Sequence, residues 1–391
     1  MATARLKKSL IAAVIAASSL CTGAWRAEAD TFVQTNLVSN IPGLATLTDP
    51  NLINPWGVSH LPTSPFWVSD QVTNVSTLYN VTGSTTITAN PLVVTIPTTA
   101  SGPPQGPTGQ VSNTNTSSFP VNGGAAANFI FANLNGTISA RNAGNAAFIQ
   151  ATTPGAVYTG LAINQAGTQL YAANGSQNRI DVFNSSFSPI SLGPTAFATP
   201  VSIPTTFVPF NVQTLNGEIY VTYAPAGRAN QISAAPGMGA VAVFNESGVL
   251  LRTMTAAQIM AAGLAAPWGI TLAPAGFGPF GGDLLVGNFS FLQSSITALD
   301  PITLAALGHI MIDAGSGNTP GALWFIGFGQ GGNNGSPNTL YFTDGINGEA
   351  DGLFGAINPV PLPGALPLFA TGLGALGLLG WRRKKKAAVA A

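Results

Sequence analysis

The amino-acid sequence predicts an all-β fold, a six-bladed β-propeller with four strands in each blade. One observation is a repeated motif. Pro-Trp-Gly followed by an alternating apolar run occurs both in NPWGVSH (54–60) and in APWGITL (266–272). Trp56 and Trp268 are 212 residues apart, which is four times 53, and weaker copies occur near that step in the interval. The other observation is that short β-rich runs separated by Gly, Pro and Asn fill the intervals, and repeats of about 40 to 50 residues are typical of propeller blades.

Six repeat starts can be placed along the chain. They are NPWGVSH at 54, PTGQVSN at 107, YTGLAIN at 158, PFNVQTL at 209, APWGITL at 266 and GALWFIGF at 321. Each start leads to a second strand, expected at 66–70, 129–133, 170–174, 219–223, 284–288 and 340–344. A third strand follows, expected at 76–80, 137–142, 179–184, 240–245, 295–300 and 352–358. Four strands per unit is the pattern of a propeller blade.

The N-terminal strand is expected to close the ring. The sixth unit ends just before Pro359 without a fourth strand, while TFVQTNLVSN (31–40) precedes the first unit and has no blade of its own. If residues 31–40 paired with the sixth unit, no unpaired strand edge would remain between the first and last blades. Trp56 and Trp268 would then begin innermost strands and pack between blades; stacking of these rings on a sugar is the alternative.

The first 29 residues are predicted to be a secretory signal peptide. Arg5, Lys7 and Lys8 form a basic start, 9–20 is apolar, and Ala27-Glu28-Ala29 is a small-residue cleavage triplet. The only cysteine, Cys21, lies in this segment. The mature chain is therefore expected to contain neither disulfides nor thiol chemistry.

Residues 360–391 are predicted to be a sorting signal. The 18 apolar residues 364–381 would form a helix of about 27 Å, near the thickness of a hydrocarbon core, and a basic tail beginning with Arg382 and Arg383 follows. This layout resembles the PEP-CTERM signal of Gram-negative bacteria, with Val360-Pro361-Leu362-Pro363 in the place of Pro-Glu-Pro and Leu362 in the place of the acid. The resemblance implies recognition by an exosortase and removal of the transmembrane helix. A permanent C-terminal membrane anchor is the alternative.

The segment between these ends, 30–359, is acidic and sparsely charged. It contains four arginines, no lysine and twelve acidic residues, for a net charge of −8. A segment with this negative charge repels phosphate backbones, so nucleic-acid binding is not expected. Its charge is compatible with divalent cations and cationic partners.

Several motifs together resemble an uncharacterised family of secreted bacterial β-propeller proteins, many with PEP-CTERM tails. They are TDPNLINPWGVSH, PFWVSD, VSTLYN, APWGITLAPAGFGPFGGDLLVGNF and NTLYFTDGINGEADGLFGAI. The likeness spans nearly the whole mature chain and implies a propeller, but it implies no particular activity.

No catalytic residue is predicted. Two G-x-G-x-x-G matches, at 276–281 and 327–332, run into strands rather than into a helix N-terminus that could hold pyrophosphate, so they are interpreted as repeat turns. No nucleophile elbow or zinc-helix motif is present, and the two histidines, His60 and His309, fall in different strands. Hydrolase activity is disfavoured, although one histidine could serve as a base.

Calcium is the one cofactor considered. If the ends of the second strands met around the axis, Asp70 and Asp344 would face a ring completed by Asn133, Asn174, Tyr223 and Asn288, an oxygen cage that suits Ca²⁺. A local alternative uses Asp344, Asn347, Glu349 and Asp351, whose spacing is not that of an EF-hand. The simpler explanation is that Asp and Asn form turns after strands.

The function predicted from these features is binding. We expect an exported protein at the cell envelope surface or in the extracellular matrix, with a glycan or protein partner, because the transport signals are clear and no catalytic constellation is. The alternative is a calcium-assisted hydrolase or lactonase with its site in the central channel.

Overall fold

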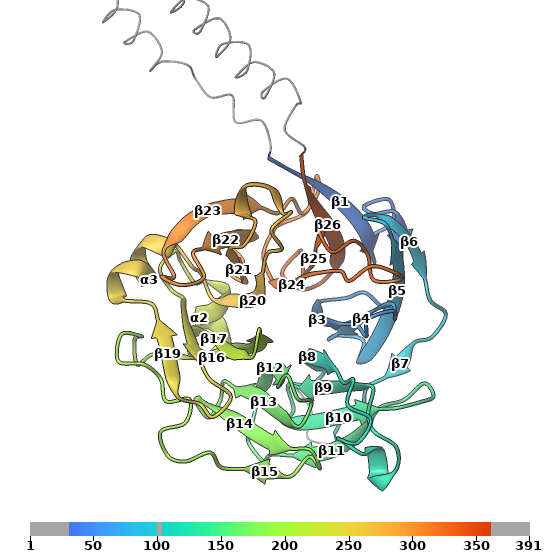
Figure 1. The fold of residues 1–391 in the computed structure, drawn as a ribbon. Coiled ribbons are helices and arrows are strands. Elements are labelled where there is room, and N and C mark those ends of the chain that lie inside the picture. The colour runs from blue at the N-terminus through green and yellow to red at the C-terminus, as the bar shows by residue number, and fades with distance from the viewer. Residues whose placement is uncertain (1–30, 100–103, 361–391) are drawn as a thin grey trace, which may run out of the picture. The chain divides into compact units, whose positions relative to one another are not determined.

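The computed structural model describes residues 31–99 and 104–360. The predicted signal peptide and the sorting signal beyond Val360 lie outside these residues. Within them, six antiparallel sheets form a ring (Figure 1), which confirms the predicted six-bladed propeller. None of the helices in these ranges combines the length and the apolar character needed to cross a bilayer.

Each of blades one to five begins with the strand nearest the axis and continues outward in sequence order (Figure 1). Blade one contains β3 (Pro55–Ser59), β4 (Phe66–Asp70), β5 (Val75–Thr82) and β6 (Thr86–Ala89), and β7 (Val94–Thr95) also pairs with β5. Blade two contains β8 (Pro107–Ser112), β9 (Phe129–Asn133), β10 (Thr137–Arg141) and β11 (Phe148–Thr152). Blade three contains β12 (Tyr158–Ile163), β13 (Gln169–Asn174), β14 (Arg179–Asn184) and β15 (Pro189–Ile190). Blade four contains β16 (Phe207–Leu215), β17 (Glu218–Pro225), β18 (Ala240–Phe244) and β19 (Leu250–Thr253), and blade five contains β20 (Pro267–Leu272), β21 (Leu284–Asn288), β22 (Ser295–Leu299) and β23 (Ala306–Met311).

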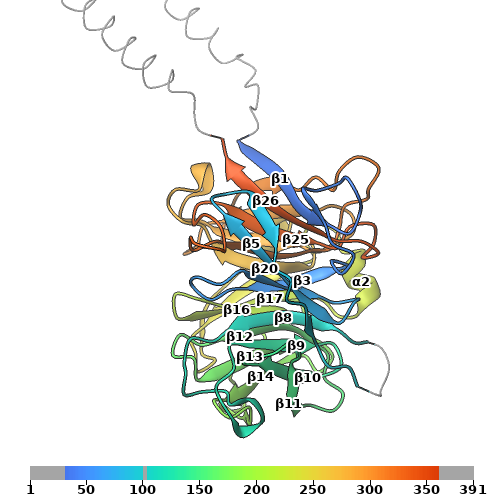
Figure 2. The same cartoon turned by 90° about the vertical axis from the view of Figure 1, so that its right-hand side faces the viewer.

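Blade six is completed by the N-terminal strand, as predicted. It contains β24 (Leu323–Phe328), β25 (Leu340–Asp344) and β26 (Leu353–Pro359), and β1 (Phe32–Ser39) pairs antiparallel with β26 from Phe32↔Pro359 to Ser39↔Leu353. A short strand that was not predicted, β2 (Leu47–Thr48), pairs parallel with β1. Both views show β1 beside β26 (Figures 1 and 2).

Local sequence explains the connections. Asn216 and Gly217, with φ of 51° and 79°, form the two-residue turn between β16 and β17, which requires positive φ at both positions. Helix α3 (Ala256–Ala262) begins with a capping box between Thr255 and Gln258 and ends at Gly263, which is left-handed. The other short helices are α2 (Arg228–Ile232), η2 (Val121–Gly123) and η3 (Gly278–Phe280).

The third position of several first strands must be glycine because neighbouring blades approach closely there. A Cβ on Gly57 would lie 2.6 Å from the carbonyl oxygen of Thr108, one on Gly109 would lie 2.4 Å from the amide nitrogen of Leu161, and one on Gly269 would lie 2.3 Å from the carbonyl oxygen of Trp324. Cβ atoms do not tolerate such distances. Glycine at these positions therefore permits the close packing of neighbouring blades.

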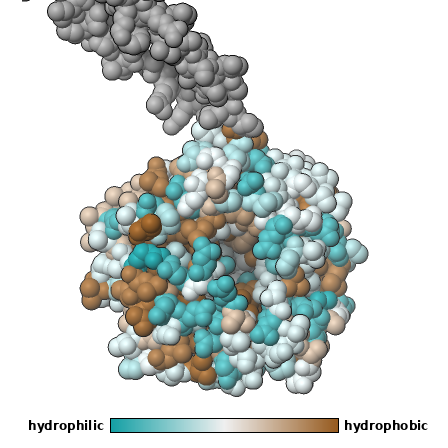
Figure 3. All heavy atoms as spheres, viewed as in Figure 1, coloured by the Kyte–Doolittle hydropathy of each residue, from teal (hydrophilic) through white to brown (hydrophobic). Residues whose placement is uncertain are grey.

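Exposed apolar side chains gather at the outer edge of blades four and five, around α3 (Figure 3). They are Val249, Leu250, Leu251, Met260, Ile302, Leu307 and Met311. This patch is separate from the axis of the ring, where the candidate site lies.

Candidate functional site

Three tryptophans meet where the first strands begin. Trp56, Trp268 and Trp324 are each the second residue of a first strand, in blades one, five and six, and none is more than 4% exposed. The rings of Trp56 and Trp324 stack with centroids 3.4 Å apart, and Trp268 is edge-on to both, at 6.1 and 5.6 Å. This tryptophan cluster confirms the packing role predicted for Trp56 and Trp268. The third member, Trp324, lay in a predicted start but was not recognised as part of the cluster.

Hydrogen bonds between blades hold the cluster in place. The indole Nε1 of Trp268 donates to the carbonyl oxygen of Thr159, two blades away, at 2.8 Å. The Nδ2 of Asn211 donates to the carbonyl oxygen of Trp268 at 2.8 Å, and the Nε1 of Trp324 donates to Asn54 Oδ1 at 2.9 Å. Blades three, four and five are thereby connected across the axis.

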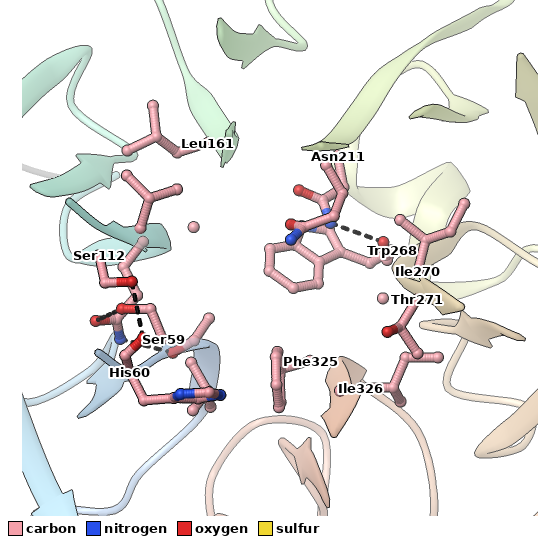
Figure 4. Close-up of a pocket in the computed structure, with 18 of the residues that line it drawn as sticks. Ser59, His60, Ser112, Leu161, Asn211, Trp268, Ile270, Thr271, Phe325 and Ile326 are labelled. Atoms are coloured by element: carbon pink, nitrogen blue, oxygen red, sulfur yellow. Dashed lines mark hydrogen bonds between the residues drawn. The ribbon is translucent and has the colours of Figure 1, made fainter. Parts of the chain in front are cut away.

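A pocket of about 240 Å³ lies at the axis and is lined by residues from the first strands of all six blades (Figure 4). Its buried wall contains Trp268, the amide side chains of Gln110 and Asn211, and five aliphatic side chains, those of Val58, Val111, Leu161, Ile270 and Ile326. Its half-buried lining includes Ser59, His60, Ser112, Ile163, Gln213, Thr271, Phe325 and Phe328. The side chains of the buried wall are therefore mostly apolar, with a few uncharged polar groups, a composition typical of sites for small ligands.

Some of the polar groups serve the fold. Gln110 Nε2 donates to the carbonyl oxygens of Gly57 and Trp67, both at 2.9 Å, and Ser59 Oγ donates to Gln110 Oε1 at 3.1 Å. Ser112 Oγ donates to the carbonyl oxygen of His60 at 2.8 Å. These bonds join blades one and two at the rim and fix the positions of the two hydroxyl groups.

His60 is the titratable residue of the pocket. Its Nε2 lies 3.4 Å from the carbonyl oxygen of Phe328, whereas its Nδ1 is buried and has no partner among the described residues. Burial lowers the pKa of the imidazole, so the ring is neutral at pH 7. Since no lysine, arginine, aspartate or glutamate lines this pocket among the residues that the structure describes, the pocket carries no charge.

Uncharacterized viral proteins are similar to this chain, although no protein-family profile matches it. An uncharacterized protein of Acanthamoeba polyphaga mimivirus is 29% identical over 348 residues, which are 82% of this chain and 78% of the viral protein. A second uncharacterized protein of the same virus is 32% identical over 268 residues, 64% of this chain and 67% of that protein.

The chain belongs to the family of these mimivirus proteins. The names of the two relatives state no activity, and they do not bear on the resemblance to a secreted bacterial family. A solved structure of streptogramin B lyase has 11% sequence identity and a TM-score of 0.47, over 84% of this chain and 97% of the lyase chain.

None of the six residues predicted at the ends of the second strands lines the axial pocket, and among them the hydroxyl of Tyr223 is buried without a partner in the described residues. Asp70 Oδ2 accepts hydrogen bonds from the amide nitrogen and Oγ1 of Thr77, at 3.1 and 2.8 Å. Asp344 Oδ2 accepts one from Ser294 Oγ at 2.7 Å. Asn133, Asn174 and Asn288 likewise donate to residues of the following strand or turn. The structure thus does not bring the six side chains together at the axis, because the first strands occupy it.

Both buried carboxyl groups have perturbed acidities. Desolvation raises the pKa of Asp70 well above its usual range, and nearby Asp49 adds to the effect, whereas the bonds from Thr77 oppose it. Desolvation raises the pKa of Asp344 to about 7. One oxygen of each, Oδ1, is buried without a partner among the described residues. Calcium binding at Asp70 or Asp344 stays a prediction.

Two members of the second predicted calcium set, Asn347 and Asp351, are bonded to each other. Asn347 Nδ2 donates to Asn318 Oδ1 at 2.9 Å and to Asp351 Oδ2 at 2.8 Å, and Asp351 Oδ1 accepts a bond from Asn40 at 2.7 Å. Glu349 forms an ion pair with Arg228 of α2. Within 31–99 and 104–360, no three His, Cys, Asp or Glu residues lie close enough together to hold a metal ion.

The two glycine motifs lead into strands, as predicted. The match at 276–281 lies between β20 and β21 and contains the short helix η3. In the match at 327–332, the first glycine, Gly327, belongs to β24 and not to the loop that follows. His309 lies in the outer strand β23, where its Nδ1 is 3.2 Å from Thr297 Oγ1, so it is remote from the axial pocket.

Proposed function

We propose that this protein is an exported binding protein whose axial pocket takes a small uncharged polar ligand, and that the ligand class is a sugar. The observation that supports this is the lining of the pocket. Aliphatic and aromatic side chains form its wall, amides and hydroxyls form its rim, and His60 Nδ1 is buried there without a partner. A volume of about 240 Å³ is slightly below the range of about 300–1,000 Å³ usual for larger ligands, which suits a single small unit.

Charge and chemistry favour a neutral ligand. A buried ion without a partner is costly, and the described lining of the pocket offers no opposite charge. A sugar has hydroxyl groups that both donate and accept hydrogen bonds, and its apolar face packs on aromatic rings such as Phe325 and Phe328. Thr271 and Gln213 are half-buried at positions where they can bond to such hydroxyls.

The competing function is a calcium-assisted lactonase that acts in the channel. It has less support because Asp70 and Asp344, the carboxylates it would use, do not line the pocket. Export, and processing by an exosortase at the envelope surface, are part of the proposal and are supported by the two terminal segments of the sequence.

A ligand screen tests the proposal against its competitor. Purified protein is titrated by saturation-transfer NMR with glucose, galactose, mannose and N-acetylglucosamine, and lactones are supplied as substrates with calcium or with EDTA. We expect saturable binding of a neutral sugar that Thr271→Val weakens about 5- to 10-fold, the cost of one hydrogen bond. Thr86→Val, the same change on the exposed outer strand β6, leaves binding unchanged. Calcium-dependent lactone turnover that Asp70→Ala or Asp344→Ala abolishes would instead establish the lactonase.

A further inference from the structure

Two further pockets follow the axial one toward the periphery. The first, of about 370 Å³, lies over blades two, three and four and shares Ser112 and Ile163 with the axial pocket. The second, of about 330 Å³, lies over blade two and shares Asn113 with the first. These shared residues make the three pockets neighbours in a row, here called the amide groove, that runs from the axis to the periphery.

All parts of the amide groove lie on one face of the propeller. Its residues come from the ends of first strands and from the loops that join first to second strands or third to fourth strands. Asn113, Asn115 and Asn128 belong to the β8–β9 connection, Asn142 follows β10, and Asn216 is in the β16–β17 turn. In an up-and-down sheet these connections project from the same edge, so a single extended ligand can contact them all.

The described residues that line the groove are uncharged. No lysine, arginine, aspartate or glutamate is among the described residues that line the three pockets. The one carboxylate alongside, Glu246, accepts hydrogen bonds from the amide nitrogen of Gln165 and from Asn164 Nδ2, at 3.2 and 3.3 Å, and so belongs to the wall. A nucleic acid or an acidic polymer would find no cation here.

The amide side chains are held in fixed orientations. Asn115 Nδ2 donates to the carbonyl oxygen of Ala166 at 3.0 Å and thereby joins blades two and three. Asn128 Nδ2 donates to the carbonyl oxygen of Asn142 at 3.0 Å, and Asn142 Nδ2 donates to that of Ala125 at 3.1 Å. Preorganised groups lose little entropy when a ligand binds.

A second unpartnered polar atom lies along the groove. Thr214 lines the pocket over blades two, three and four, and its Oγ1 is buried without a hydrogen-bond partner among the described residues. His60 Nδ1, in the axial pocket, is likewise buried without a hydrogen-bond partner among the described residues. A buried polar atom without a partner costs free energy, which a ligand hydroxyl would recover.

We propose that the amide groove binds a linear chain of neutral sugar residues, with one residue in the axial pocket and the next ones over blades three and two. This inference rests on the proposed function, since it extends the same site. It adds that the ligand is an uncharged oligosaccharide or polysaccharide and that affinity increases with its length.

The test measures affinity against chain length. The monosaccharide that binds best is compared with its linear neutral oligomers of two to six residues by isothermal titration calorimetry. We expect affinity to rise at least 10-fold between one residue and four and then to level off. Ala125 is an exposed residue of the pocket over blade two. Ala125→Trp should remove most of this rise in affinity and leave monosaccharide binding intact. Ala89→Trp, the matched control on the outer strand β6, should change neither.

The outcomes separate the two proposals. If a monosaccharide binds and Thr271→Val weakens it, but oligomers bind no more tightly, the groove proposal is overturned and the axial site stands. Binding of no neutral sugar overturns both. Equal or tighter binding of an anionic oligomer, such as one of uronic acids, overturns the neutral ligand class. A melting temperature for Ala125→Trp within a few degrees of the parent value shows that any loss reflects the filled pocket and not unfolding.

Discussion

The indole rings of Trp56 and Trp324 stack with their centroids 3.4 Å apart and their planes inclined by 20°, although the two residues begin the first and the last blade of the ring. The Nε1 of Trp56 is buried and makes no hydrogen bond to a described residue. Its contribution to the fold is therefore the contact itself, with the rings of Trp324 and Trp268.

Truncation of Trp324 should destabilise the propeller strongly. Trp324→Ala removes a fully buried ring, the stack on Trp56 and the bond to Asn54, and we expect a loss of about 3–5 kcal/mol in the free energy of unfolding. Urea denaturation followed by circular dichroism measures this. Phe148→Ala, which removes a half-exposed ring from β11, should cost less than about 1 kcal/mol. Equal losses in the two variants would show that the cluster has no special role.

Close approach of the blades should make Gly109 irreplaceable. Gly109→Ala would place its Cβ 2.4 Å from the amide nitrogen of Leu161, and the resulting displacement should cost about 1–3 kcal/mol. In Gly175→Ala the new Cβ would be 3.5 Å from its nearest neighbour, the carbonyl oxygen of Pro209, so the free energy of unfolding should change by less than about 0.5 kcal/mol. Melting temperatures of both variants provide the comparison. A tolerated alanine at 109 would mean that the strands can move apart.

Asp344 should make stability fall as the pH rises. Its pKa is about 7 in the folded protein and 3.8 in its unperturbed state, so the folded protein binds more protons between these values. Stability is therefore greatest below about pH 4 for this group and is lost as the pH rises through 7, by up to about 4 kcal/mol. Asp344→Asn keeps an oxygen for Ser294 and should flatten the profile between pH 4 and 8. The exposed change Asp313→Asn is the control, and parallel profiles for Asp344→Asn and the parent would refute the assignment.

Loss of Arg228 should leave a mostly buried acid without its partner. Burial raises the pKa of Glu349, and Arg228 opposes that rise. Because Arg228 is 43% exposed, solvent screens the pair, and we expect Arg228→Ala to cost only about 1–2 kcal/mol at pH 7. Adding Glu349→Gln should restore part of this. Arg179→Ala breaks a more exposed pair with Asp181 and should cost less than about 0.5 kcal/mol in the same denaturation assay.

Export should remove both terminal segments. The mature protein is expected to begin at Asp30 and to lose the residues that follow the 360–363 motif in a cell that has an exosortase. Intact-mass measurement of surface material, compared with a strain that lacks the sorting enzyme, checks this. If residues 364–391 were present in both strains, the segment would be a permanent anchor.

The strand pattern of the propeller was predictable because each blade repeats the same local signals. The first, second and third strands of all six blades lie within a few residues of the predicted ranges. The closing strand was also predictable, since the sixth unit lacked a partner for its edge. The short strands β2 and β7 were not, because two-residue bridges depend on tertiary position and have no periodic signal.

The site was harder to predict because it is formed by residues that the repeat does not align. The second-strand ends, such as Asp70 and Asp344, recur regularly in the sequence, but their partners are the adjacent strands and loops. The unpartnered atoms of His60 and Thr214 follow from how the first strands meet at the axis. One signal was present in the sequence, since apolar residues at the fourth position of most first strands predict an apolar channel wall.

The pairing of Phe32 with Pro359 makes the last blade depend on both ends of the propeller. Until the final strand β26 has been synthesised, β1 and β25 have no strand between them, and the sheet of the last blade is incomplete. Contacts of such long sequence separation are entropically costly and form slowly. Ring closure therefore waits until the last strand is complete, and if the chain is exported as proposed, this delay would favour its passage through a translocation pore before the ring has formed.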